Sequence, residues 1–391
     1  MYTHTDERGL STTNAYDSLN RLTNSANPLG AITYLYSKLD VVQVKDRMGF
    51  TNSFAYDAVR RRTAETNALG RATRYNYCSC GALDSIQDAA GNYTYFTYDY
   101  AGRLTQAAYP DLYTNNFNYD LLGELTDTTD SAGVIITNWF NNQGQLYAIQ
   151  DLAGLRSALA FDAEDRVTNS WDANGVSIAM TYDNLGRLLT RTYPDAGVEH
   201  FGYSARGLIA YTNQIGLSNF FAYDAAARKT FETNANGEVL RYTNDAAGDL
   251  LSLTDGKFQT TRWNYDQYGR VTNKLDQAGS VILTYTYDSD SRLTNRWSAA
   301  KGNTGYAYDP VGSLTNAAYP ASGTVKFAYD VMNRLTNMVD GVGTNRYTYD
   351  AAGQLLTEDG PFTSDTVTNT YSNRPSHLSV ALRSSFYDAY S

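Results

Sequence analysis

The chain has 391 residues, with 31 Lys and Arg against 41 Asp and Glu, which gives a formal net charge of −10. This balance argues against nucleic acid as a partner, because phosphate binding requires clustered basic side chains and the Arg residues here are spread along the chain. No apolar run approaches the roughly 18 residues that a membrane span requires. Tyr is over-represented at 34 residues, and with many Thr, Asn, Asp and Gly it favours strands joined by turns.

The chain begins inside a repeated unit. Its first residues, MYTHTDERGLSTTNAYD, contain no apolar signal-peptide core. Within them, ERGLSTTNAYD matches the second half of the unit that recurs along the rest of the chain. We therefore expect a partial unit at the N-terminus, which would leave a sheet edge unpaired.

From Tyr16 onward, an aromatic residue recurs every 20 to 22 positions. Self-similarity at such a period indicates an array in which each unit buries its apolar face against its neighbours. We predict a single array over residues 1–391 with about 18 units, the last of them irregular or truncated from about residue 371. The predicted structural ladder consists of Tyr16, Tyr56, Tyr98, Tyr119, Phe161, Tyr182, Tyr223, Tyr265, Tyr287, Tyr308, Tyr329 and Tyr349.

A turn signal follows each ladder residue. The next position is Asp in 13 of 18 copies, and the fourth position is Gly in ten copies and Asn or Asp in four more, including Asp40. Asp accepts backbone hydrogen bonds at the start of a turn, and Gly or Asn tolerates the left-handed conformation. An aliphatic residue stands two positions later in 15 copies, so it can share a hairpin face with the aromatic. The predicted turn residues are Asp17, Asp99, Gly102, Asp183, Gly186, Asp266, Gly269, Asp330 and Asn333.

The other half of each unit contains a second turn signal, such as DAAG at Asp88 or DQAG at Asp276, followed by an alternating run such as NYTYFTYD. Alternation with period two predicts strands. Each unit then holds two strands and two turns, with no room for a helix. We predict an all-β fold of about 36 antiparallel strands, in which tandem hairpins of about 21 residues form one long sheet that curls into a spiral or partial shell.

Three copies depart from the pattern. Cys78 and Cys80 replace the Asp and a turn residue of one unit, and a disulfide across a single residue is expected to be strained. We interpret this as a locally modified turn, and metal or redox chemistry is the alternative. The aromatic is replaced by Asn244 in a second unit. The turn glycine is replaced by Pro375 near the C-terminus, before a last aromatic turn at Tyr387 and Asp388.

These repeats carry a family resemblance. The 21-residue spacing and the YDxxGRLTN signature resemble the YD or Rhs repeat of bacterial Rhs toxins, of the shell component of insecticidal toxin complexes and of teneurins. The resemblance implies a strip of hairpins that spirals into a hollow shell, which in the toxins encloses a C-terminal toxic polypeptide. Shells of this family close with a DPxGL element that supports self-cleavage. The nearest string here, DPVGSL at residues 309–314, is in register as an ordinary turn.

The sequence predicts no catalytic residue, cofactor or metal site. The regular Asp residues are explained by their turn register, and His4, His200 and His377 are widely separated with no nucleophile motif nearby. The GGxGxD pattern of calcium-binding β-solenoids is missing. The Arg beside each turn glycine, for example Arg103 or Arg270, is interpreted as a salt bridge or a stack on a neighbouring unit's Tyr, and a ligand ladder is the alternative.

We therefore expect a non-enzymatic structural shell segment that encapsulates or presents another polypeptide. The expected partners are an enclosed or fused polypeptide, or further YD-repeat segments of a longer shell, with no nucleic acid and no membrane span. The alternative is a cell-surface adhesion module that binds a glycan or a surface protein, because the curled face carries Tyr, Asn and Thr. Both hypotheses place the protein in the secreted or cell-surface class.

Overall fold

The computed structural model describes residues 1–371. Every regular element in this range is a β-strand, and the 36 strands form one antiparallel sheet. The predicted all-β class and strand number are therefore confirmed. The features predicted at Pro375, His377, Tyr387 and Asp388 lie outside the described residues.

The first eight strands pair each with the next. Their bounds are β1 Tyr2–Thr5, β2 Ser11–Tyr16, β3 Leu22–Asn27, β4 Gly30–Ser37, β5 Asp40–Lys45, β6 Thr51–Tyr56, β7 Arg62–Thr66 and β8 Ala72–Tyr77. A second run of consecutive pairs joins β9 to β15. Its bounds are β9 Leu83–Gln87, β10 Tyr93–Tyr98, β11 Leu104–Ala108, β12 Thr114–Tyr119, β13 Leu125–Asp130, β14 Ile135–Phe140 and β15 Leu146–Asp151.

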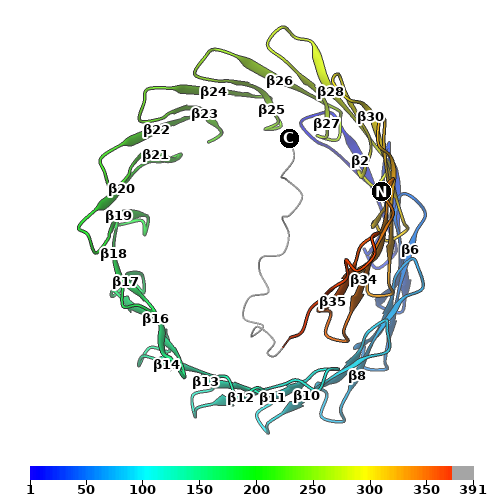
Figure 1. Ribbon diagram of the computed structural model, residues 1–391, viewed down its shortest axis with the longest axis vertical. Helices are drawn as coiled ribbons and strands as arrows, with labels where there is room; N and C mark the ends of the chain where they lie inside the picture. Colours follow the sequence, from blue (N-terminus) through cyan, green and yellow to red (C-terminus); the bar gives the residue numbers. More distant parts are fainter. Residues whose placement is uncertain (372–391) are drawn as a thin grey trace. The chain divides into compact units, whose positions relative to one another are not determined.

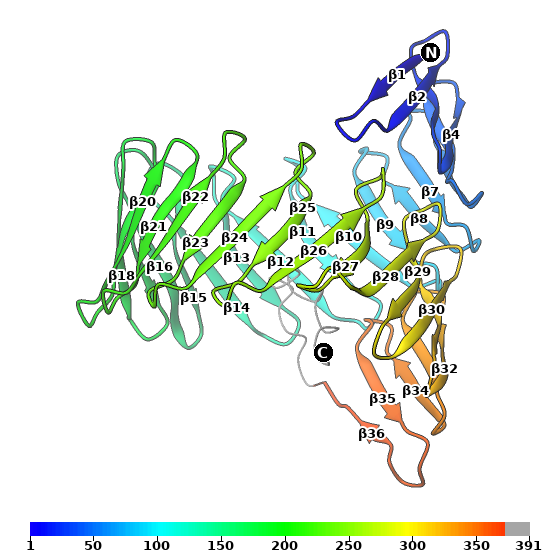
Figure 2. The ribbon, with the colours of Figure 1, turned by 90° about the horizontal axis from the view of Figure 1, so that it is seen from above.

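The longest run of consecutive pairs joins β16 to β32, and its hairpins lie side by side in Figures 1 and 2. The bounds are β16 Gly154–Phe161, β17 Val167–Asp172, β18 Ser177–Tyr182, β19 Leu188–Thr192, β20 Val198–Ser204, β21 Gly207–Thr212, β22 Ser218–Tyr223, β23 Lys229–Thr233, β24 Val239–Asn244, β25 Leu250–Thr254, β26 Thr260–Tyr265, β27 Val271–Leu275, β28 Val281–Tyr287, β29 Leu293–Ser298, β30 Gly302–Tyr308, β31 Leu314–Tyr319 and β32 Gly323–Tyr329. A last run comprises β33 Leu335–Val339, β34 Thr344–Tyr349, β35 Leu355–Asp359 and β36 Val367–Thr368.

The strands group into two compact units. The first contains residues 1–74 and 156–327, and the second contains residues 75–155 and the described residues from 328 onward. Each unit is thus made of segments far apart in the sequence. Within the first unit, turns of these distant segments contact one another, as Arg8 does with Asp249.

The strands show the alternation that the sequence predicts. In β26, Arg262 and Asn264 are exposed whereas Trp263 and Tyr265 are half-buried, and β8, β22, β24 and β34 repeat the same pattern. In the β10–β11 hairpin, Tyr98 lies opposite Leu104, so the aromatic and the aliphatic residue share one face. The register shifts by one residue beside Tyr98, which is a β-bulge.

The hairpin turn has one recurring backbone form. In the turn after β10, the Gly102 N–H donates to the Asp99 carbonyl and the Asp99 N–H donates to the Arg103 carbonyl, both at 3.0 Å. Gly102 has φ of 79°, which is the left-handed residue that closes a three-residue hairpin loop. The predicted left-handed slot fails at Asp40, because the two-residue loop there is shorter: Asp40 begins β5 and Lys38 is left-handed, with φ of 53°.

Cys78 and Cys80 occupy a turn of this form and are bonded to each other. The Gly81 N–H donates to the Cys78 carbonyl at 3.0 Å, as in the other hairpins. The sequence indicates a locally modified turn and does not predict this bond; the structure joins the two sulfurs within that turn. The turn brings the Cα atoms to 5.2 Å, within the range of roughly 4.4–6.8 Å that disulfides use.

A sheet that is covered by no second layer of described elements buries few side chains deeply. In the second unit, Ala107, Ile136 and Ala148 are buried, and the Tyr113 hydroxyl donates to the buried Asp130 carboxylate at 2.6 Å. In the first unit, Ala317 is buried. The hairpins are therefore joined by the backbone pairing of their strands, and half-buried side chains at the turns add further contacts.

Candidate functional site

The turn carboxylate organises each hairpin end. In the turn after β26, one oxygen of Asp266 accepts the backbone N–H groups of Tyr268 at 2.9 Å and Arg270 at 3.1 Å. The other oxygen accepts Nε of Arg270 at 2.8 Å and also lies 2.7 Å from Nη2. The carboxylate forces the chain back on itself and fixes the direction of the arginine side chain.

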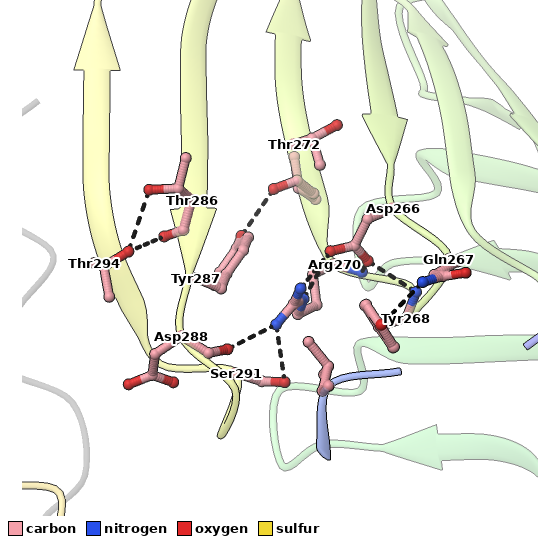
Figure 3. Close-up of polar contacts among 12 residues, drawn as sticks. Asp266, Gln267, Tyr268, Arg270, Thr272, Thr286, Tyr287, Asp288, Ser291 and Thr294 are labelled. Carbon is pink, nitrogen blue, oxygen red and sulfur yellow. Dashed lines mark hydrogen bonds and ion pairs between the residues drawn. The ribbon is translucent and has the colours of Figure 1, made fainter. Parts of the chain in front are cut away.

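The same arginine reaches the next hairpin (Figure 3). Nη1 of Arg270 donates to the Asp288 carbonyl at 3.1 Å and lies 3.3 Å from the Ser291 hydroxyl. The guanidinium carbon is 4.8 Å from the ring centroids of both Tyr268 and Tyr287, within the range of cation–π contacts. Arg270 therefore joins the turn that carries it to the following turn.

A tyrosine of the later hairpin bonds back to the earlier hairpin. The Tyr287 hydroxyl donates to the Val271 carbonyl at 2.8 Å, so the later hairpin is also bonded to the earlier one. We call the turn Asp, the Arg four residues after it and the recurring aromatic Tyr of the next unit an arginine tie. The tie of Asp266, Arg270 and Tyr287 satisfies a carboxylate, a guanidinium and two backbone carbonyls across one pair of hairpins.

Arginine ties recur in both units. In each, the carboxylate–guanidinium pair is accompanied by a guanidinium 4.3 to 5.3 Å from the next ring centroid. The ties are Asp17–Arg21–Tyr36, Asp99–Arg103–Tyr119, Asp162–Arg166–Tyr182, Asp183–Arg187–Tyr203, Asp266–Arg270–Tyr287, Asp288–Arg292–Tyr308 and Asp330–Arg334–Tyr349. The interpretation of the repeated Arg as a salt bridge and a stack on the neighbouring Tyr is confirmed.

In six of the ties the pKa of the turn carboxyl group lies below its usual value, at Asp17, Asp99, Asp162, Asp183, Asp266 and Asp330. The backbone N–H of Arg103, and then its guanidinium, hold the pKa of Asp99 below its usual value. For Asp17 the Arg21 guanidinium is the larger cause of the lowered pKa, followed by the Arg21 backbone N–H. These carboxylates are stabilised in the charged form, which is unsuited to a general acid at neutral pH.

The structure places every predicted ladder residue at the last position of a strand. The rings are half-buried, except that Tyr16 is 42% exposed. The ladder residues end β2, β6, β10, β12, β16, β18, β22, β26, β28, β30, β32 and β34. Phe161 contributes a ring without a hydroxyl, so it cannot make the bond to a carbonyl that Tyr182 makes with Val167 at 2.7 Å.

The predicted turn residues lie in the turns that follow. Asp17, Asp99, Asp183, Asp266 and Asp330 each accept the N–H groups two and four residues later. Gly102, Gly186, Gly269 and Asn333 have φ of 79°, 76°, 76° and 61°. The structure thus brings each turn Asp together with an Arg and with the ladder Tyr of the next unit.

Sequence reasoning missed two features of this site. It did not foresee that the arginine donates to the carbonyl of the following turn, although the constant spacing of Arg and aromatic residues carries that signal. It also missed the contact of Arg8 with Asp249, which are 241 residues apart. No local pattern could have paired those two side chains.

Two models of known protein families match parts of the chain. Residues 250–375 match the Teneurin YD-shell model, and residues 161–198 match the RHS repeat model. The chain is built from YD/Rhs repeats. A search of the curated proteins returned no match to this YD/Rhs array.

Solved structures share the fold of the YD/Rhs array. A crystal structure of TcdB2-TccC3 without its hypervariable C-terminal region is similar over 89% of this chain and 23% of that one, with a TM-score of 0.78 and 14% identity. TcdB2-TccC3-TEV covers 90% of this chain and 22% of its own, with a TM-score of 0.63 and 16% identity. The Photorhabdus luminescens Tc holotoxin pore covers 90% and 21%, with a TM-score of 0.55 and 16% identity. The YD/Rhs array thus spans less than a quarter of each of these solved chains.

Within residues 1–371, the structure contains no helix that could span a membrane.

Proposed function

We propose that the YD/Rhs array is a structural wall segment without enzymatic activity, formed by residues 1–391 as one array. The observation that supports this proposal is the recurrence of arginine ties in both units, each binding one hairpin to the next. The regular carboxylates, which could suggest acid–base chemistry, are occupied by arginine and backbone N–H groups. Their use is mechanical: they fix the turn and join it to its neighbour.

The wall belongs to a shell that encloses or presents another polypeptide. Support comes from the similarity in fold to TcdB2-TccC3, one structure of which was solved without its hypervariable C-terminal region. Because this chain spans 23% of the first of those chains, its partners are further YD/Rhs segments of a longer shell and a fused or enclosed polypeptide. A shell of this kind acts as a secreted or cell-surface protein.

Protease protection tests the enclosure. The complete natural gene product is treated with proteinase K, and intact mass measurements follow each segment outside the YD/Rhs repeats. We expect one segment to survive as long as the repeats remain folded and to be degraded once urea unfolds them. The same segment expressed alone, without the repeats, is the matched control and should be degraded at once.

If every segment outside the repeats is degraded at the same rate in the complete protein as when expressed alone, the enclosure proposal is wrong. Particle images of the same sample provide a second measurement, because an enclosing wall must appear as a closed or spiral shell. A flat, open strip would also contradict enclosure.

The alternative function, binding a glycan or a surface protein, is favoured by one local observation. In β10 the rings of Tyr93 and Tyr95 stack with centroids 5.6 Å apart, and both side chains are exposed, as is Trp139 in β14. Exposed stacked rings suit the apolar faces of sugars. Loss of glycan binding on a glycan array in a Tyr93→Ala and Tyr95→Ala variant, with Tyr100→Ala as an exposed aromatic control, would favour this alternative over enclosure.

A further inference from the structure

One YD turn in the first unit has the wrong charge for an arginine tie. The turn after β24 begins with Asp245, but the position four residues later, which is Arg in the neighbouring units, is Asp249. The Asp249 N–H still donates to the Asp245 carboxylate at 2.9 Å, so the backbone of the turn is retained. The turn therefore presents two carboxylates and lacks a guanidinium of its own.

The missing guanidinium comes from the first turn of the chain. Nε and Nη2 of Arg8 donate to the two carboxylate oxygens of Asp249, each at 2.8 Å, which is the bidentate geometry of a strong ion pair. The hydrogen bond to Asp249 raises the pKa of Arg8. Both side chains are largely shielded, with 26% and 14% of their surfaces exposed.

Arg8 also fits the next turn. A Cβ atom at Gly269 would lie 3.0 Å from the Arg8 guanidinium, so the glycine leaves the space that the arginine uses. Figure 3 shows the N-terminal segment, in blue, passing beside the turn that carries Tyr268 and Arg270. Arg8 is thus inserted between the turns at residues 245–249 and 266–270.

Two further contacts within the first unit join its N-terminal turns to later turns with nearly the same offset in sequence. The backbone N–H of Arg47 donates to the Asp290 carboxylate, and the offset of 243 residues is close to the 241 between Arg8 and Asp249. A hollow of about 370 Å³ is lined by Asn67 and Ala68 on one side and by Pro310 to Gly312 on the other. The turns at residues 6–9, 46–49 and 67–70 therefore face a second row of turns at residues 245–249, 288–292 and 309–313.

We propose that the Arg8–Asp249 pair is a charge key that selects the register between these two rows of turns. The equivalent positions one hairpin before and one hairpin after Asp249 are Arg228 and Arg270. A slip of the rows by one hairpin in either direction would place Arg8 against an arginine instead of a carboxylate. The neighbouring turns are otherwise alike in shape, so this charge difference distinguishes the correct register from its two nearest competitors.

The chain offers a variant that removes the key without damaging the turn that carries it. In Asp249→Arg, the new guanidinium faces Asp245 from the position that Arg270 has relative to Asp266. The β24–β25 hairpin should keep its own stability, whereas Arg8 meets a like charge. Loss of the contact between the two rows of turns can then be distinguished from unfolding of the hairpin.

Hydrogen exchange with mass spectrometry on the whole chain tests the key. In Asp249→Arg, amides of residues 2–16 should exchange faster by on the order of tenfold, while those of residues 239–254 remain as protected as in the parent. The reversed pair, Arg8→Asp with Asp249→Arg, should return residues 2–16 to within about threefold of the parent. Glu7→Arg is the control, because it adds the same charge in the facing turn at an exposed side chain without touching Asp249.

Two results would overturn the proposal. The first is unchanged exchange of residues 2–16 in Asp249→Arg. The second is a reversed pair that exchanges as fast as Asp249→Arg alone, because a charge key must be restored by charge reversal. The outcome does not depend on whether the shell encloses a polypeptide.

Discussion

Residues 265–309 and residues 119–146 each contain turns of the hairpin form, yet only turns of the first region carry the Asp–Arg pair of an arginine tie. Arg270 and Arg292 bind successive turns in residues 265–309, whereas the corresponding positions in the second region are Glu124 and Gln145. The backbone turn is nevertheless the same: the Asp120 N–H donates to the Glu124 carbonyl at 3.0 Å, as the Asp266 N–H does to Arg270. The hairpin turn and the tie between hairpins are therefore separate properties of the repeat.

The second region replaces the tie with other donors. Phe140 has no hydroxyl, but the Asn138 side-chain amide donates to the Leu125 carbonyl at 2.9 Å, the bond that Tyr287 makes to Val271 elsewhere. The amide of Asn141 donates to Gln145 at 2.7 Å, in place of the ion pair. A carbonyl at the start of each hairpin's second strand thus needs a donor from the next hairpin, and the identity of that donor can vary.

The largest effect should come from removing a ladder ring that is part of a tie. Tyr287→Ala removes a half-buried ring, its hydroxyl bond and its contact with Arg270, and we expect a loss of about 2 to 3 kcal/mol. Urea unfolding followed by hydrogen exchange of residues 265–309 measures it. Phe140→Ala, which removes a ring without a hydroxyl, should cost clearly less. Equal losses would show that ring burial alone, and not the tie, stabilises the hairpins.

The next largest effect should come from the arginine. Arg270→Ala leaves Asp266 with its backbone bonds alone and removes the bond to the Asp288 carbonyl, so we expect a loss of about 1 to 2 kcal/mol. Amide hydrogen exchange should accelerate in both hairpins that Arg270 connects, β26–β27 and β28–β29. Gln145→Ala is the matched substitution in the other region. A Gln145→Ala loss as large as that of Arg270→Ala would remove the distinction between the two regions.

The regions should also respond oppositely to acid, with a smaller amplitude. Burial, and then the Asp120 carboxylate, raise the pKa of Glu124 above its usual value. A raised carboxyl pKa means that stability falls as pH rises through it, so acidification from pH 7 should stabilise residues 119–146. Burial raises the pKa of Asp266, but the Arg270 bonds outweigh burial and lower it, so the stability of its tie should be lost only below about pH 4.

Exchange rates corrected for intrinsic pH dependence measure the gain in residues 119–146 between pH 7 and 4, and the loss in residues 265–309 below about pH 4. Glu124→Gln should abolish the gain in residues 119–146 and leave residues 265–309 unchanged. A gain that survives this substitution would assign the effect to another group.

The sequence predicts the repeated backbone well because each turn is encoded within five consecutive residues. Asp99 and Gly102 predict the turn, and Tyr98 and Leu104 mark the strands on either side of it. The contacts that depend on side chains far apart in the sequence could not be predicted in this way. Arg8 reaches Asp249 across 241 residues, and no local pattern pairs those two side chains.

The smallest predicted effect tests whether the donor to the Leu125 carbonyl is interchangeable. Asn138→Ala removes the amide bond and should cost about 1 kcal/mol, the usual net value of one hydrogen bond. Adding Phe140→Tyr to that variant supplies a hydroxyl from the ladder position, where Tyr119 already donates to the Leu104 carbonyl at 3.0 Å. We expect the double variant to regain the loss in urea unfolding, because the carbonyl again has a donor. Phe140→Tyr without Asn138→Ala should gain much less, since the Leu125 carbonyl is then already bonded; equal gains in the two backgrounds would show that the hydroxyl acts elsewhere.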